Sequence, residues 1–196
     1  MALAGFWSGD PGAFGVLDED TLQVCRDAVG PDHPTTLGLA TLLTSILVPR
    51  GQIQQARVLG EDTLRRSRQV HGPDHLITVG SGAALAFALA ADGDAEQARV
   101  LSEDALQRTR SALGPDNLST LGSAAALTAA LTGLGQMVRA RTLGEDTLRR
   151  SRTALGPDHP VTQAVVQTLA MVTMLDEVTQ SPDTDRSHPT QHPGAI

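Results

Sequence analysis

One internal repeat runs through most of this 196-residue chain and limits what the chain can fold into. The phrase GPD occurs four times, at Gly30, Gly72, Gly114 and Gly156, and each occurrence begins 42 residues after the last. Other glycines keep the same step without any insertion: Gly51, Gly93 and Gly135. A repeat of this length predicts an array of similar supersecondary units, each packed only on its neighbours.

The unit from Gly114 to Leu155 predicts a pair of helices. Glycine suits the position after a helix end, proline stops the helix, and Asp116 can cap the next one. Apolar residues recur at helical spacing over 118–134, and a second amphipathic helix follows over 137–155. Applied to the whole chain, the pattern predicts helices at 13–29, 34–49, 53–70, 76–91, 95–113, 118–134, 137–155 and 160–178.

The composition favours an all-α fold with an unusual core. Hydrophobic residues make up 40% of the chain and aromatic residues only 2%, so leucine, valine and alanine must form the interior. Glycine, serine and threonine would let the helices approach closely. We predict an N-terminal segment or partial repeat at 1–12. A helical array at 13–178 follows, with three full pairs between two single helices, and then a disordered tail at 179–196.

The polar face of the second helix in each pair carries acid–base pairs four residues apart. Such pairs each support a helix by about 0.2–0.5 kcal/mol. We interpret this face as solvated and self-paired, and an arginine-rich phosphate site is the alternative interpretation. The pairs are Glu61–Arg65, Asp62–Arg66, Glu145–Arg149 and Asp146–Arg150.

Charge and spacing argue against several function classes. The net charge is −7, so we expect no basic footprint for a nucleic acid. The chain also contains no lysine, so we expect no lysine-bearing phosphate loop. His33, His75 and His159 suggest a metal site, but equivalent residues of stacked units lie on the order of 10 Å apart. Zinc requires ligands about 2.0–2.1 Å from one ion. Paired carboxylates such as Glu61–Asp62 lie beside arginine, where nothing would raise a pKa. We expect no catalytic residue, cofactor or metal.

The chain shows no targeting signal, and we expect no membrane contact. Residues 117–138 are uncharged and long enough to span a bilayer. They are rich in glycine, serine and threonine, and a helix, a turn and the start of a second helix explain them better. The only cysteine, Cys25, aligns with Ser67, Thr109 and Ser151, so we interpret it as a small packed residue. We predict a cytoplasmic protein.

Particular positions resemble the tetratricopeptide repeat (TPR) signature. A Leu-small pair, a turn glycine and small residues on the second helix appear as Leu85-Ala86, Gly93, Ala98 and Ala105-Leu106. The 42-residue unit and the phrase at 155–160 are similar to the kinesin-light-chain type of repeat. Such arrays are also common in actinobacterial proteins, often behind a nucleotide-binding NB-ARC module. The resemblance implies a right-handed α-solenoid of antiparallel helix pairs.

In this family the first helices of the pairs line a groove that holds peptides or helices, which implies a non-catalytic protein-interaction scaffold. Carrying the groove over by position gives a set without charge, so we expect an apolar or amphipathic partner segment. The positions are Thr41, Ser45, Val48, Ala83, Phe87, Ala90, Ala125, Ala129, Thr132, Gln167, Met171 and Met174.

Two alternatives remain open. In place of a scaffold, the first alternative is a regulatory or sensor arm of a larger NB-ARC-type NTPase, and the second is a self-association module. Residues 1–9 align with only the second half of a first helix, so a homo-oligomer could form through this open N-terminal end, or Phe6 and Trp7 could cover it. The outer face with its arginines and glutamates is the other candidate surface for a partner.

Overall fold

The computed structural model describes residues 17–180 of the chain, with side chains from 17 to 177. This part of the chain forms eight α-helices and no strand, which confirms the all-α class. The helices are α3 (Glu19–Val29), α4 (Pro34–Leu47), α5 (Ile53–His71), α6 (Leu76–Ala91), α7 (Ala95–Leu113), α8 (Leu118–Gly133), α9 (Met137–Ala154) and α10 (Pro160–Gln180).

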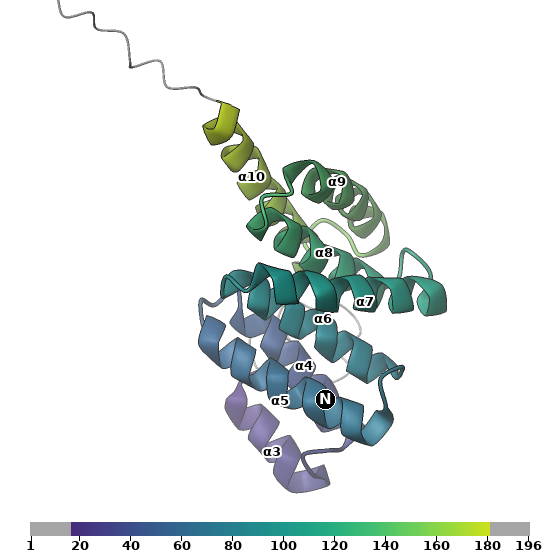
Figure 1. Cartoon of the computed structure of the whole chain (residues 1–196). Coiled ribbons are helices and arrows are strands. Elements are labelled where there is room, and N and C mark those ends of the chain that lie inside the picture. Colours follow the sequence, from purple (N-terminus) through teal and green to yellow (C-terminus); the bar gives the residue numbers. More distant parts are fainter. Residues whose placement is uncertain (1–16, 181–196) are drawn as a thin grey trace, which may run out of the picture.

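The helices stack in chain order from α3 at one end to α10 at the other (Figure 1). The first helices of the pairs contact one another in sequence, as α4 with α6, α6 with α8 and α8 with α10. Each second helix, α5, α7 or α9, packs on its own first helix and on the next one. This arrangement is the α-solenoid of helix pairs that the repeat predicts.

The core is divided along the stack into three clusters. Leu22, Leu43 and Leu59 centre the first cluster, and Leu64, Leu85 and Leu89 the second. Leu106, Leu127 and Leu131 centre the third, which also takes in Val172 of α10. Each cluster draws on neighbouring helices only, because a repeat unit buries its apolar face against the units beside it.

Glycines end the helices where the backbone turns into a conformation that other residues rarely adopt. Gly72 has φ of 80° after α5, and Gly93 has φ of 91° between α6 and α7. Every residue with positive φ in the described part of the chain is a glycine. The two glycine rows of the repeat are therefore turn positions, as predicted.

The predicted cap of the first helices is wrong, because the histidine or asparagine after GPD caps them instead of the aspartate. Nδ1 of His75 accepts a hydrogen bond from the backbone N–H of Ile77 at 3.2 Å. In the third unit Oδ1 of Asn117 accepts from the N–H of Ser119 at 2.9 Å. Both side chains place an acceptor at the same point, which explains the exchange of histidine for asparagine.

The first helix begins later than predicted. Asp18 caps it by accepting from the N–H of Thr21 at 2.8 Å, so α3 starts at Glu19 rather than near residue 13. At the other end α10 continues to Gln180. The expected segment at 1–12, with Phe6 and Trp7, and the tail from 181 onward lie outside the described residues.

The aspartates of GPD bind the second helices. Nη1 of Arg66 on α5 lies 2.9 Å from Asp32, and Nη1 of Arg150 on α9 lies 2.9 Å from Asp116. Arg108 on α7 contacts Asp74 in the same way. Each pair of helices is thus linked at its base through an arginine that also binds an aspartate on its own helix.

The predicted pairs on the second helices are partly correct. Arg66 binds Asp62 at 2.8 Å and Arg150 binds Asp146 at 2.9 Å, four residues apart as expected. Arg65 and Arg149 also bind these aspartates, not the preceding glutamates, among the described residues. The aspartates lie three residues before these arginines, within reach on a helix surface.

Candidate functional site

The first helices of the three full pairs, α4, α6 and α8, carry no charged residue, which makes their free side an unusual surface. The sequences of α4, α6 and α8 contain no acid or base at any position. Several of their hydroxyl groups are used within the protein. Thr41 and Ser81, for example, join α4 to α6 with their oxygens 2.8 Å apart.

Three glycines inside these helices face open space. A Cβ atom added at Gly38 or Gly122 would meet nothing within 4 Å, and one at Gly80 would meet only the Cγ2 atom of Thr41 at 4.0 Å. Packing within the protein therefore does not require glycine here, although a helical glycine costs about 0.5–1 kcal/mol relative to alanine. We call this side of α4, α6, α8 and α10 the A-helix face.

The predicted groove residues occupy three kinds of position. Ser45, Gln167, Met171 and Met174 are exposed. Thr41, Ala83, Phe87, Ala90 and Ala129 are half-buried. Val48, Ala125 and Thr132 are buried, so in this conformation their side chains are inaccessible to a partner.

Some residues of the A-helix face were missed by sequence reasoning. The three glycines were missed, and so were Leu42 and Ile46, which are half-buried and pack with Phe87 against the first cluster. The glycines carried a signal, because glycine inside a helical pattern without a turn requires an explanation. Leu42 and Ile46 carried none, since apolar residues on a helix are ordinarily core.

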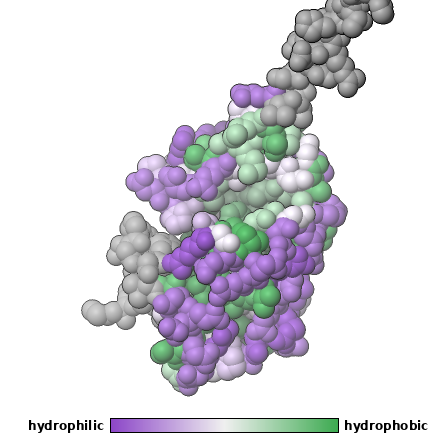
Figure 2. All heavy atoms as spheres, turned by 90° about the vertical axis from the view of Figure 1, so that its left-hand side faces the viewer, coloured by the Kyte–Doolittle hydropathy of each residue, from purple (hydrophilic) through white to green (hydrophobic). Residues whose placement is uncertain are grey.

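The last helix, α10, exposes an apolar side chain at a position whose equivalents in α8 and just after α4 are buried. Met174 is 66% exposed, whereas the equivalent residues Val48 and Thr132 are 9% and 4% exposed. Those two are covered because another first helix stacks beyond them, and the described chain has none beyond α10. Figure 2 shows hydrophobic surface gathered at this upper end of the molecule, where α10 lies.

The arginines of the outer face are largely occupied by carboxylates. Arg99 lies 2.6 Å from both Glu96 and Glu103, and these hydrogen bonds raise its pKa above the ordinary value. Burial acts to raise the pKa of Asp62, but hydrogen bonds from Arg66 and Arg65 outweigh it and hold the pKa below its usual range. These arginines therefore have little capacity left for a phosphate.

Metal binding and membrane crossing find no support within residues 17–177. No three histidine, cysteine, aspartate or glutamate side chains in this part come together as a metal site. Cys25 lies 3.4 Å from the hydroxyl of Thr36, a contact of a packed small residue. None of the described helices combines the length and hydrophobicity that crossing a membrane requires.

The stacked pairs, glycine turns and shared interfaces define a helical repeat protein. A family model described as tetratricopeptide repeat matches residues 36–76, 78–118 and 120–161. The chain therefore belongs to the TPR family. TPR repeats generally mediate protein–protein interaction, and the family is one of scaffolds rather than catalysts.

Solved structures share the fold. The nearly identical TPR-like repeats of a putative kinesin light chain from Podosopora anserina align with a TM-score of 0.57 and 24% identity, over 91% of this chain and 85% of that one. A glutamine-to-methionine variant of those repeats aligns with a TM-score of 0.58 and 24% identity, over 91% and 84%. No curated protein matches the chain.

Proposed function

We propose that the protein is an interaction scaffold that binds an apolar or amphipathic segment of a partner protein on the A-helix face. The observation that carries this proposal is the open row of Gly38, Gly80 and Gly122 on helices without charge. Bare helix backbone lets a partner chain approach closely, and the half-buried Phe87 offers it an apolar contact.

The absence of charge on α4, α6 and α8 restricts the chemistry of the partner. A segment that depends on its own charges would find no counter-charge on these helices. It would lose its hydration without gaining an ion pair. An amphipathic helix can instead place its apolar side on the face and keep its polar side in water.

Peptide display with a matched pair of variants tests the proposal. Gly122→Arg places a long charged side chain where the structure has room, so the fold is preserved and the face is obstructed. Gln107→Arg adds the same charge on the exposed side of α7. Randomised peptides would be selected on the wild-type protein and then measured against both variants by fluorescence anisotropy.

The expected result is that selected peptides are amphipathic, bind the wild type and Gln107→Arg equally, and lose binding to Gly122→Arg. Circular dichroism would establish that both variants keep the helical fold. Peptides that bind Gly122→Arg as tightly as the wild type would place the partner elsewhere on the molecule and overturn the proposal.

Self-association is a second candidate function, favoured by the exposed end of α10. Met171 and Met174 occupy positions that in the earlier units are followed by another first helix. A helix of a second copy could cover them. Sedimentation at several concentrations would show a dimer that Met174→Gln weakens and Val58→Gln, at an exposed site on α5, leaves unchanged.

A further inference from the structure

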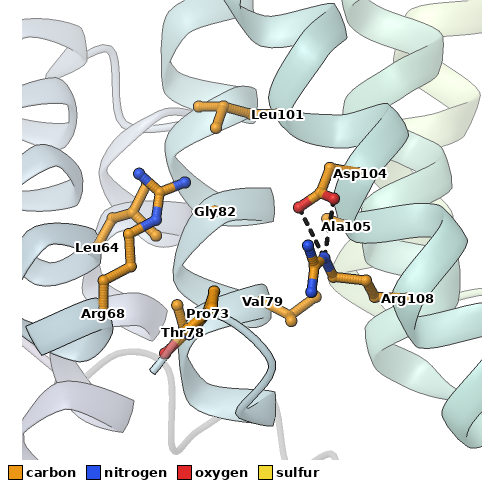
Figure 3. Close-up of a pocket in the computed structure, with 10 residues that line it drawn as sticks. All are labelled: Leu64, Arg68, Pro73, Thr78, Val79, Gly82, Leu101, Asp104, Ala105 and Arg108. Carbon is orange, nitrogen blue, oxygen red and sulfur yellow. Dashed lines mark hydrogen bonds and ion pairs between the residues drawn. The ribbon is translucent and has the colours of Figure 1, made fainter. Parts of the chain in front are cut away.

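A polar cleft of about 200 Å³ opens between α5, α6 and α7, away from the A-helix face. Arg68 reaches into it from α5, and Asp104 and Arg108 stand on α7 at the other side (Figure 3). Val79 and Gly82 of α6 lie between them, and Leu64 and Leu101 add apolar wall.

The cleft exists because three wall positions are smaller here than in the units on either side. Val79 replaces the leucine found at positions 37 and 121, and Gly82 replaces the alanine at 40 and 124. Ala105 replaces the threonine at 63 and 147. In the flanking units these larger side chains are buried, so they fill the equivalent space.

The polar groups of the cleft are unequally engaged. Nε of Arg108 donates to Asp104 at 2.8 and 2.9 Å, and the same guanidinium also contacts Asp74. Arg68, by contrast, has no ion pair or side-chain hydrogen bond within the described part of the chain. The cleft therefore holds one arginine that is already engaged by two carboxylates, and the guanidinium of the exposed Arg68, which has unused donors.

A threonine of the same wall has also lost its usual partner. Thr36, Thr120 and Thr162 donate to the carbonyl of the GPD glycine at 2.7, 2.8 and 2.8 Å. Thr78 is the equivalent residue of the second unit. It is 3% exposed, and its Oγ1 has no hydrogen-bond partner in the structure. The second unit thus departs from the repeat in polar contacts as well as in size.

We propose that this cleft binds a carboxylate on a short apolar stem, held by Arg68 and enclosed by Leu64, Val79 and Leu101. A guanidinium binds a carboxylate through two parallel hydrogen bonds. The cleft is smaller than the roughly 300–1,000 Å³ of sites for drug-sized ligands, which excludes a nucleotide. A glutamate side chain of a partner and a free short-chain acid share this chemistry.

Titration with sodium butyrate, followed by the amide signals of Gly82 and Ala105 in NMR spectra, tests the proposal. Butyramide has a similar shape without the charge and serves as the chemical control. Arg68→Gln removes the guanidinium, and Arg110→Gln makes the same change at the equivalent position of the next unit. Ala105→Thr restores the larger residue of the flanking units and fills the cleft.

Butyrate should give saturable shifts in the wild type and in Arg110→Gln, and butyramide should not. Arg68→Gln should weaken binding by about tenfold or more, and Ala105→Thr should abolish it. No saturable shift with butyrate, equal shifts with butyramide, or equal loss in the two arginine variants would each overturn the proposal. Retained helical signal by circular dichroism shows that the variants are folded.

A blocked peptide with a central glutamate distinguishes the two sources of the carboxylate. Tighter binding of the peptide than of butyrate indicates a partner side chain, and binding of butyrate alone indicates a free acid. Both outcomes support the site. Failure of the cleft proposal would leave the proposed scaffold function intact, because the scaffold proposal concerns the A-helix face.

Discussion

Arg66 on α5 and Asp32 in the loop before α4 lie 34 residues apart in the chain, and their side chains meet at 2.9 Å. Arg150 and Asp116 repeat this contact two units later. The aspartate of GPD therefore links the second helix of a pair to the start of the first. The aspartate of the repeated phrase therefore serves to link the two helices and does not cap the first one.

The Arg66 contact gives a prediction on stability. Arg66→Gln should lower the free energy of unfolding by about 0.5–1 kcal/mol, because one guanidinium binds two partly exposed carboxylates. Urea denaturation at low salt measures the loss, which should shrink at high salt. Arg65→Gln, whose ion pair stays within α5, is the control and should cost less. Equal losses in the two variants would contradict a linking role for Asp32.

Exchange of the capping residue tests why asparagine can replace histidine. His75→Asn should leave stability nearly unchanged, whereas His75→Ala should cost about 1 kcal/mol, since only asparagine restores an acceptor for the N–H of Ile77. Thermal unfolding by circular dichroism measures both. If His75→Asn lost as much as His75→Ala, the imidazole would have another role.

The cap at His159 predicts a dependence on pH. Burial lowers the pKa of His159, so the folded protein favours the neutral ring, whose Nδ1 accepts from the N–H of Val161 at 3.2 Å. The contribution of this residue is complete above the ordinary histidine pKa of about 6.5. It is lost as the pH falls through the lowered value. Urea denaturation at pH 7.5 and 5.5 should show a smaller decline for His159→Asn than for the wild type.

Replacing each of two helical glycines by alanine should change the free energy of unfolding in opposite directions. At Gly144 a Cβ would lie 2.7 Å from Cδ2 of Leu169 and 3.0 Å from Cγ2 of Thr128, so Gly144→Ala should destabilise by about 1–3 kcal/mol. Gly122→Ala meets nothing and should stabilise by about 0.5–1 kcal/mol. Chemical denaturation measures both changes. A loss at Gly122 would show that the A-helix face is packed rather than open.

The isosteric change from threonine to valine should also affect the free energy of unfolding differently at Thr78 and at Thr120. Thr78→Val removes a buried hydroxyl without a partner and should stabilise the protein or leave it unchanged. Thr120→Val breaks the 2.8 Å bond to the carbonyl of Gly114 and should cost about 1 kcal/mol. Similar losses for both variants, measured by urea denaturation, would mean that the Thr78 hydroxyl is satisfied in solution.

Helix positions followed closely from the sequence because they depend on local signals. Glycine turns such as those at Gly72 and Gly93, and apolar spacing between them, act over a few residues and repeat unchanged. The start of α3 was predicted too early, because residue spacing alone did not show that Asp18 is the cap from which the helix begins. The exchange of His75 for Asn117 is visible in the sequence, yet its cause required the position of Nδ1 relative to the next turn.

The candidate site was less predictable. Position in the repeat identified exposed residues such as Ser45 and Met171, but it also selected Val48, Ala125 and Thr132, which are buried. How far one helix covers the next depends on the distance and angle between them. Small residues such as Gly60, with Thr44 and Leu85 within 3.3 Å of an added Cβ, set that distance jointly with their neighbours.

The sequence by itself therefore determined the number of units, their helices, their turns and the absence of charge on α4, α6 and α8. Only the tertiary structure decided which small residues are packed and which are open, and which arginines are engaged. Gly122 and Gly144 are the same residue in similar helices, and Arg68 and Arg108 lie on neighbouring ones. Gly144 meets Thr128 of its own pair and Leu169 of the next unit, whereas Gly122 meets nothing within 4 Å. Arg108 meets Asp104 on its own helix and Asp74 in the loop before α6. These contacts depend on how the helices pack, which the sequence around each residue does not specify.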